Sequence, residues 1–293
     1  MDNGTPYPGP ADTSNATAQA ARLLTSFFTA KTLRRIEATH AHFSPEQTYY
    51  ADATLGWEFP SNEALRQVWE QYMPRWGEAA RSYPVQVLGD TSGAAVVMTD
   101  TPELFGGEIR GIAIVDFVDE KIMRWVDYWD GRGFGTGAAD HLRVPAEDFP
   151  ASLGADTVQA RPAPVLGAAV EHLMPAIRSG DDGRLNELLA YDATLEDLAL
   201  RTRVRGRAAV VRYLQRACGR LPYQGAVVRH VAGNEQGGGF EWTAEGEEVP
   251  RGAAALALDG DGRITSLTLC WDGSLLDDDR ITALTTLAIE PRR

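Results

Sequence analysis

The chain has 293 residues, of which 44% are hydrophobic, 24% charged and 9% aromatic. This composition is that of a folded globular protein with room for two domains, and it excludes disordered and collagen-like chains. The 41 acidic residues outnumber the 28 basic ones, and the net charge of −13 disfavours nucleic acid and anionic membranes as partners. We expect a cytoplasmic protein, because no signal peptide and no apolar run of membrane-spanning length is visible. Cys218 and Cys270 are too few for a disulfide framework.

The hydrophobic pattern predicts the same order of elements twice. In the first half, helical spacing predicts helices at 17–38 and from Ser61 onward, with a short strand at 54–59 between them. The strands predicted next lie at 83–88, 94–99, 109–117 and 121–128. The second half has predicted helices at 165–179 and 207–218 and predicted strands at 226–231, 240–243, 253–258 and 264–271. Helices followed by antiparallel strands indicate an α+β fold, in which helices pack on one face of a curved sheet.

Three short strings recur in the same order and predict an internal duplication. The pairs are Asp52-Ala-Thr-Leu with Asp192-Ala-Thr-Leu, Arg110-Gly with Arg251-Gly, and Trp129-Asp-Gly with Trp271-Asp-Gly. Their offsets, the differences between these residue numbers, are 140, 141 and 142. Each copy is long enough to bury its own core, so we expect two domains. The predicted division is a disordered tail at 1–15, domain 1 at 16–135, a linker rich in Gly, Ala, Pro and Asp at 136–163, and domain 2 at 164–293.

The element order and the last strand of the first copy, Ile-Met-Arg-Trp-Val-Asp-Tyr-Trp-Asp at 122–130, resemble the nuclear-transport-factor-2-like superfamily. The resemblance is greatest to its SnoaL-like polyketide cyclase and limonene-epoxide-hydrolase-like branches. It implies two tandem cone-shaped α+β barrels, each with helices packed on a curved, mostly antiparallel sheet. It also implies that the two domains pair through their sheets within one chain, and homodimerisation of the chain stays open.

Alternation along the last strand of the first copy places Trp125, Asp127 and Trp129 on one face. Burial between aromatic walls raises the pKa of a carboxyl group, so Asp127 is a predicted catalytic acid or base, with a salt-bridged or solvated Asp as the alternative. Asp100 is the predicted second catalytic carboxylate, with a turn role as the alternative. In the epoxide-hydrolase-like branch an Arg precedes this second carboxylate by two residues. Met98 stands there in this chain, which argues against hydrolysis of an epoxide to a diol.

Substrate-binding positions are predicted for six side chains: Tyr50, Trp57, Glu58, Arg110, Trp125 and Trp129. Tyr50 and Trp57 are alternatively core aromatics, and Glu58 is alternatively a solvated surface carboxylate. Asp52, which flanks the same short strand, is better explained by a cap or turn role.

Arginines provide two further features. Because Arg110 recurs as Arg251, a structural role competes with substrate anchoring. In the structural role, Arg110 pairs with Asp130 and Arg251 pairs with Asp272. A second feature is an alternating basic edge, which either binds an anion or is a solvated strand edge: Arg201, Arg203, Arg205 and Arg207.

The second copy lacks the predicted chemistry. At the offset of the last strand, Leu269 replaces Asp127 and Leu267 replaces Trp125, and an apolar strand cannot transfer protons. Domain 2 is therefore expected to be a degenerate or supporting copy. A different site in domain 2 stays open, because three carboxylates are present: Glu196, Asp197 and Glu241. Of these, Glu241 is expected opposite Asp100, at the equivalent position of the repeat.

These features together predict a cofactor-independent acid/base enzyme with its active site in domain 1. The expected reaction is cyclisation or isomerisation of a small apolar natural-product intermediate, of polyketide or terpenoid type, by epoxide or enolate chemistry. No cofactor and no metal site are predicted, because His40-x-His42 has no spaced partner set of ligands. The alternatives are a non-catalytic ligand-binding or scaffolding module and an epoxide hydrolase.

Overall fold

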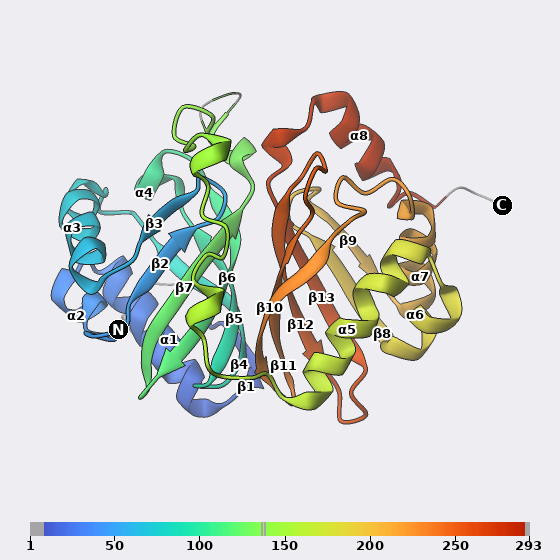
Figure 1. The fold of residues 1–293 in the computed structure, drawn as a ribbon, viewed down its shortest axis with the longest axis horizontal. Coiled ribbons are helices and arrows are strands. Elements are labelled where there is room, and N and C mark those ends of the chain that lie inside the picture. The colour runs from blue at the N-terminus through green and yellow to red at the C-terminus, as the bar shows by residue number, and fades with distance from the viewer. Residues whose placement is uncertain (1–8, 136, 138, 291–293) are drawn as a thin grey trace.

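Two β-sheets lie face to face at the centre of the molecule, and helices cover their outer faces (Figure 1). The arrangement comes from a computed structural model, which describes residues 9–135, 137 and 139–290. Within those residues, no helix is both long enough and apolar enough to cross a membrane. The first eight residues of the predicted tail, residues 136 and 138 of the predicted linker, and residues 291–293 lie outside the described part of the chain.

Domain 1 forms a seven-stranded sheet in the order β1-β4-β5-β6-β7-β2-β3. Its helices are α1 (Ala18–Thr32), α2 (Ile36–His40), α3 (Asn62–Tyr72) and α4 (Pro102–Phe105). Its strands are β1 (Asp12–Ala16), β2 (Tyr49–Asp52), β3 (Trp57–Phe59), β4 (Ser82–Gly89), β5 (Gly93–Asp100), β6 (Ile109–Val118) and β7 (Lys121–Trp129). Strands β4 to β7 are antiparallel neighbours, whereas β2 lies parallel to β7.

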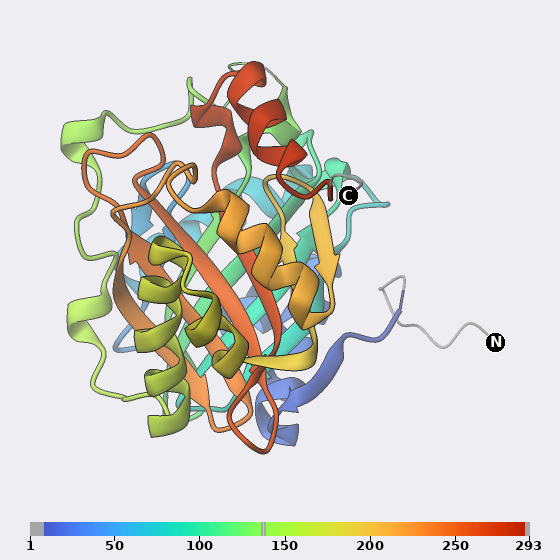
Figure 2. The ribbon, with the colours of Figure 1, turned by 90° about the vertical axis from the view of Figure 1, so that its right-hand side faces the viewer.

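Domain 2 repeats this sheet with six strands in the order β10-β11-β12-β13-β8-β9. Its helices are α5 (Pro164–Ser179), α6 (Asp182–Leu188), α7 (Arg207–Ala217) and α8 (Asp278–Thr286). Its strands are β8 (Leu189–Asp197), β9 (Thr202–Arg205), β10 (Val227–Asn234), β11 (Gly237–Thr243), β12 (Arg251–Leu258) and β13 (Ile264–Trp271). Helices α5 and α7 cross the outer face of this sheet (Figure 2). The predicted α+β fold with two tandem sheets is thereby confirmed.

Local capping explains where the helices of domain 1 begin. The side chain of Ser61 accepts a hydrogen bond from the backbone N–H of Ala64 and caps α3, at the start that the sequence predicts. The helix predicted at 17–38 is two helices, because the chain turns between α1 and α2 at Arg34, whose φ is +55°. The buried face of α1 carries Phe27 and Phe28, which pack into the core of domain 1.

The start of the described chain forms a strand, where a disordered tail reaching residue 15 is predicted from composition. Strand β1 pairs in parallel with β4. The side-chain amide of Asn15 also donates a hydrogen bond to the carbonyl of Gln236 in domain 2, at 3.0 Å. The prediction is wrong for this segment because backbone pairing at an open sheet edge does not require an apolar sequence.

The two sheets bury a shared layer of small and aliphatic side chains between them. Alternation along each strand sends every second residue to this layer and the others to the core of its own domain. Members of the layer include Ile112, Ile114 and Val126 from domain 1 and Ala253, Ala255 and Cys270 from domain 2. The segment between the domains descends along the seam (Figure 1), and its Leu153 is fully buried in the same layer.

A cluster of charges is enclosed within this interface. The guanidinium of Arg124 on β7 is fully buried and contacts both carboxylate oxygens of Glu241 on β11, at 2.7 and 2.8 Å. It also donates to Asp116 at 3.1 Å. Arg229 and His230 on β10 complete the cluster, at 3.0 Å from Glu241 and 2.9 Å from Asp116 respectively. Removing Glu241 would leave Arg124 with one carboxylate and Arg229 without its ion pair.

The strand register shows which residues of the two copies are equivalent. Gly111 lies opposite Trp129, and Gly252 lies opposite Trp271, so the Arg-Gly and Trp-Asp-Gly strings occupy the same places in both domains. The expectation that Glu241 stands opposite Asp100 is wrong. Residue 241 is the counterpart of Val97, since these two residues pair with Ala253 and Ile112 at equivalent points of the sheets.

The remaining repeated string, Asp-Ala-Thr-Leu, is not a structural repeat. Asp52 lies opposite Asp127 in the parallel pairing of β2 with β7. The residue at the same point of the parallel pairing of β8 with β13 is Asp197, which lies opposite Leu269. Asp192 is exposed to solvent at an earlier position of β8, so its match to Asp52 is a coincidence of sequence.

Candidate active site

Domain 1 encloses a cavity of about 420 Å³. Its walls come from α1, α3 and strands of the sheet, and most of them are apolar. Aromatic members of the wall include Trp57, Phe59, Trp69, Trp76, Phe105 and Trp129. The ionisable groups in the lining are Lys31, Tyr50, Asp52, Tyr72, Arg75, Asp100 and Asp127. A large apolar cavity with a few convergent polar groups is the usual form of a small-molecule site.

Asp127 lies in the wall of this cavity, as the alternation along β7 predicts, and is only 7% exposed. The Tyr50 hydroxyl donates a hydrogen bond to its Oδ2 atom, and the indole N–H of Trp125 donates to its Oδ1 atom. Desolvation raises the pKa of Asp127 to about 7, although the charge of Lys31 and the hydrogen bond from Tyr50 act in the opposite direction. The carboxyl can therefore take up or release a proton near neutral pH.

Tyr50 and Trp125 hold this carboxyl from two neighbouring strands. They lie directly opposite each other in the pairing of β2 with β7, and their rings are stacked with centroids 6.4 Å apart. Desolvation and the adjacent Asp127 raise the pKa of Tyr50 well above its ordinary value, so the phenol keeps its proton. Trp125, predicted to bind substrate, is instead behind the cavity wall, where it packs on Phe27 with centroids 4.8 Å apart.

Asp100 also lines the cavity, and it is paired with a lysine that the sequence analysis missed. The Lys31 Nζ atom lies 3.0 Å from Asp100 Oδ2, and the Ser82 hydroxyl donates a hydrogen bond to Oδ1. The signal for Lys31 was available, because it follows Phe27 by four residues and Phe28 by three and so belongs to the buried face of α1. Its ammonium supplies a cation beside the second carboxylate, although Met98 stands at the family's Arg position.

Asp52 has the structural role that its sequence context predicts. Its Oδ1 atom accepts the backbone N–H groups of Thr54 and Leu55, both at 2.9 Å, and its Oδ2 atom accepts the indole N–H of Trp129 at 2.9 Å. Desolvation raises the pKa of Asp52 to about 6. Domain 2 repeats the arrangement, with the indole N–H of Trp271 donating to Asp197 at 3.0 Å.

Besides Trp125, two further predicted substrate-binding residues lie outside the cavity. On β3, Trp57 and Phe59 face the cavity, so Glu58 between them faces away, where it is exposed and accepts the Tyr49 hydroxyl at 2.8 Å. Arg110 projects from the opposite face of β6 and is exposed. It pairs with Glu108 at 2.9 Å, which also excludes the predicted pairing with Asp130.

In domain 2 the corresponding space is occupied by side chains. Trp242 is the counterpart of Met98, since each lies opposite the glycine of its Arg-Gly string. The Trp242 indole packs on Tyr223 with centroids 4.5 Å apart, and both residues are buried. The carboxylates that left another site open are engaged elsewhere: Glu196 with Arg203, Asp197 with Trp271, and Glu241 with Arg124. This packing supports the expectation of a supporting copy.

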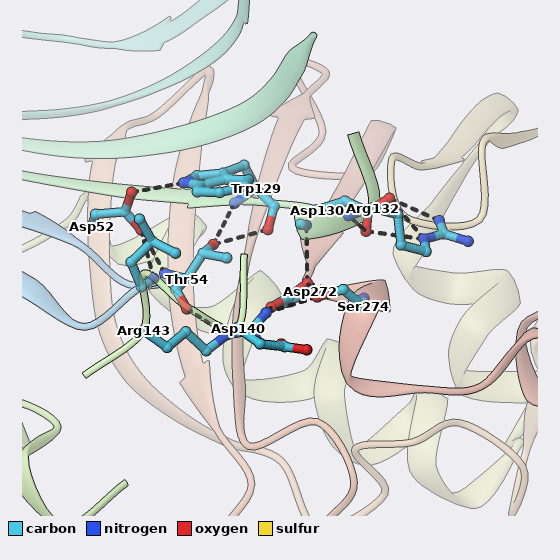
Figure 3. A network of polar contacts seen from close by, with 11 residues as sticks. Asp52, Thr54, Trp129, Asp130, Arg132, Asp140, Arg143, Asp272 and Ser274 are labelled. Atoms are coloured by element: carbon cyan, nitrogen blue, oxygen red, sulfur yellow. Dashed lines mark hydrogen bonds and ion pairs between the residues drawn. The ribbon is translucent and has the colours of Figure 1, made fainter. Parts of the chain in front are cut away.

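A polar network connects the cavity to domain 2 (Figure 3). The Thr54 hydroxyl donates to the carbonyl of Trp129 at 2.9 Å, and the carbonyl of Thr54 accepts from Nε of Arg143 at 3.3 Å. Arg143 comes from the segment between the domains and forms ion pairs with Asp140 and Asp272. The guanidinium of Arg143 thus links Thr54, at the rim of the cavity, to Asp272 of domain 2.

The same network explains the glycine of the repeated Trp-Asp-Gly string. The backbone N–H of Gly131 donates to Asp272 Oδ1 at 2.9 Å, across the domain boundary. A Cβ atom on Gly131 would lie 2.6 Å from Ser274 Oγ, and one on Gly273 would lie 2.8 Å from Nε of Arg132. Each copy of the string thus contacts the other copy, and both glycines lie where the interface leaves no room for a side chain.

Among the described residues, no group of three or more His, Cys, Asp or Glu side chains is arranged to hold a metal ion.

Comparison with known proteins gives matches of about one domain in length. A family model described as a SnoaL-like domain matches residues 170–267, from α5 into β13. A steroid delta-isomerase of Nocardioides simplex is 33% identical over 107 residues, which are 36% of this chain and 87% of that protein.

Two similar solved structures also match about one domain of this chain. A steroid delta-isomerase of Pseudomonas aeruginosa has 18% identity and a TM-score of 0.33, over 43% of this chain and 89% of its own. An NTF-2-like protein of unknown function from Burkholderia xenovorans LB400 has 14% identity and a TM-score of 0.33, over 38% of this chain and 82% of its own. From the family model and the Nocardioides relative, the chain belongs to the SnoaL-like family of nuclear-transport-factor-2-like proteins.

Proposed function

We propose that this protein is a cofactor-independent acid/base enzyme, an isomerase or cyclase, that acts on a small apolar molecule in the domain 1 cavity. One observation carries the proposal: a buried carboxyl, Asp127, lies in a largely aromatic cavity with its pKa raised to about 7. An acid with a pKa near the working pH can both accept and return a proton during turnover.

The groups around Asp127 suit proton transfer at a carbon next to a carbonyl. In its ionised form Asp127 takes the proton, and the electron pair of the broken C–H bond moves to the carbonyl oxygen to form an enolate. The positive charge of Lys31 lowers the energy of that oxyanion, and the Tyr50 hydroxyl is a second donor once the carboxyl is protonated. Return of the proton to a different carbon completes an isomerisation, whereas attack of the enolate carbon on an internal electrophile completes a cyclisation.

The cavity supports an apolar ring system as the substrate class. A volume of about 420 Å³ lies in the range of small-molecule sites, and the aromatic walls provide apolar contact rather than polar recognition. The steroid delta-isomerase relatives are named for an isomerisation, which fits this proton-transfer chemistry. Within this substrate class, we propose a polyketide or terpenoid intermediate.

Epoxide opening is a second candidate, because the Lys31–Asp100 pair supplies the cation and carboxylate that the sequence lacks on one strand. Reaction in ¹⁸O-labelled water separates the two candidates. Hydrolysis transfers one labelled oxygen to a diol, whereas isomerisation or cyclisation leaves the oxygen content of the substrate unchanged.

The test uses Asp127→Asn, which keeps the shape of the side chain and removes its basicity. Exchange of α-protons in D₂O is followed by ¹H NMR for a panel of cyclic unsaturated ketones. We expect the wild type to exchange or isomerise at least one member, and Asp127→Asn to lose about 10²–10⁴-fold in rate. Glu58→Gln is the matched control, an exposed carboxyl-to-amide change on the same sheet, and it should retain full rate. Binding of the panel without any turnover would instead establish a ligand-binding module.

A further inference from the structure

The two arginines of the repeated Arg-Gly string have different surroundings. Arg110 in domain 1 pairs with Glu108, two residues before it, at 2.9 Å. The residue two positions before Arg251 is Val249, which is fully buried. The carboxylate that neutralises the arginine of the first copy is therefore absent from the second.

Arg251 lies instead beside a second cavity, of about 370 Å³, between the domains. Its guanidinium carbon is 3.3 Å from the centroid of the Phe149 ring, so the group lies against the face of that ring. Burial lowers the pKa of Arg251 to about 10. The charges of Arg229 and Arg143 act in the same direction, whereas Tyr128 and Asp272 act in the opposite direction. Within the part of the chain that the structure describes, no ion pair or hydrogen bond joins this guanidinium to a neighbour.

The acidic side chains of this cavity already have partners. Glu247 accepts the backbone N–H of Gly225 at 3.0 Å, and Glu248 pairs with Arg280 at 2.9 Å. Asp272 pairs with Arg143, which excludes the predicted pairing of Asp272 with Arg251. The half-buried guanidinium of Arg251 therefore has no ion-pair partner among the described residues, and the charge of Asp272, which acts on it, is already paired with Arg143, so an anionic ligand would stabilise it.

We propose that the cavity between the domains binds a small organic monocarboxylate through Arg251, separately from the catalytic cavity. A planar carboxylate matches the guanidinium geometry and accepts two parallel N–H bonds. The apolar body of the ligand would contact Pro250, Trp271 and Leu275, which line the same cavity. The glutamates of the lining disfavour a dianion such as phosphate, so a single negative charge on an apolar skeleton fits best.

The position of Trp129 gives this second cavity a connection to the first. Trp129 lines both cavities, and its indole N–H donates to Asp52. Thr54 and Arg143, which join the cavity rim to domain 2 (Figure 3), line the second cavity as well. A bound carboxylate would contact the residues that hold the rim in place.

Benzoate is a suitable probe, with benzamide as its neutral counterpart and inorganic phosphate as a dianion. Isothermal titration of the full chain should show one benzoate site with a Kd of about 1–10 mM, as expected for a ligand of nine heavy atoms. Arg251→Gln should weaken benzoate at least tenfold, and Arg251→Lys, which keeps the charge, should retain part of the binding. Arg110→Gln is the matched control and should bind as the wild type does.

Several results would overturn the assignment. Equal binding of benzoate and benzamide would show that the charge is not recognised, and unaltered binding by Arg251→Gln would place the ligand elsewhere. Loss of benzoate binding in Lys31→Met would place it in the catalytic cavity, where Lys31 is a cation of the lining. Tighter binding of phosphate than of benzoate would contradict a monocarboxylate site. Thermal unfolding of each variant establishes that it is folded, and Arg251→Lys keeps the test decisive if Arg251→Gln does not fold.

Discussion

Titration of the Asp127 carboxyl tests the electrostatics of the catalytic cavity without knowledge of the substrate. The pKa of Asp127 is raised from 3.8 to about 7 by desolvation. A shift of about three units corresponds to about 4 kcal/mol of preference for the neutral carboxyl in the folded protein. The folded state therefore binds this proton more tightly than the unfolded chain does. The resulting contribution to stability is complete below about pH 4 and is lost as the pH rises through about 7.

The assay is ¹³C NMR of a sample labelled at the aspartate side-chain carboxyl carbons. One resonance should titrate near pH 7 and disappear in Asp127→Asn. The resonances of Asp52 and Asp197 should titrate near pH 6 and disappear in their own Asn variants, because burial raises both pKa values to about 6. Lys31→Met removes a positive charge that lowers the pKa of Asp127, so the Asp127 resonance should titrate about one unit higher in that variant.

The same reasoning predicts how stability changes. Relative to the wild type, Asp127→Asn should become more stable as the pH is raised from 4 to 8, with a change in the free-energy difference of about 4 kcal/mol. A titration of the Asp127 resonance near or below pH 4, together with a free-energy difference that does not vary with pH, would refute the desolvated cavity and the proposed role of this carboxyl.

Replacing Tyr50 by Phe removes a hydrogen bond to the ionised carboxyl, so the pKa of that carboxyl should rise further in the same NMR titration; an unchanged pKa would contradict the contact. Gly131→Ala should cost about 1–3 kcal/mol in urea unfolding, because its Cβ would lie 2.6 Å from a serine oxygen, whereas Gly260→Ala, with nothing within 4 Å, should cost little. Glu241→Gln should destabilise the protein by about 3–5 kcal/mol, since it removes the buried negative charge that pairs with both Arg124 and Arg229. Glu108→Gln, at an exposed ion pair, should change stability by under about 1 kcal/mol, and equal losses for the two glutamate variants would refute the buried interface cluster.

Features that depend on local periodicity were predictable from the sequence. The start of α3 follows from Ser61 as a cap, and the face of β7 that carries Asp127 and Trp129 follows from alternation. The strands β4 to β7 and β10 to β13 fall close to their predicted positions for the same reason, whereas β8, the longest strand of domain 2, was not predicted. The prediction that Glu58 binds substrate was wrong, because β3 has only three residues, a pattern too short to show which side chains face the cavity.

Features that depend on how elements dock were not predictable in the same way. Lys31 reaches Asp100 because α1 packs on β4, the neighbour of β5 in the sheet, so that residues far apart in the chain come into contact. The match of Asp52 with Asp192 misled because identical letters carry no information on strand register, which the pairing with β13 assigns to Asp197. The surroundings of Arg251 were likewise not predictable, because they depend on Val249, which stands where domain 1 has Glu108, and on contacts with domain 1.

The asymmetry of the buried charge cluster has a consequence for how the two copies pair. If two copies of domain 1 were joined as the two domains are joined here, each Arg124 would meet Val97 in place of Glu241. Each fully buried guanidinium would then keep Asp116 but lose both of its contacts with Glu241, which would leave it with one carboxylate in place of two. The two copies are therefore complementary at this point of the interface, because only domain 2 carries the second carboxylate. A second copy of domain 1 would not supply the contacts that Glu241 makes with Arg124 and Arg229, so the pairing of the sheets depends on residues that differ between the copies.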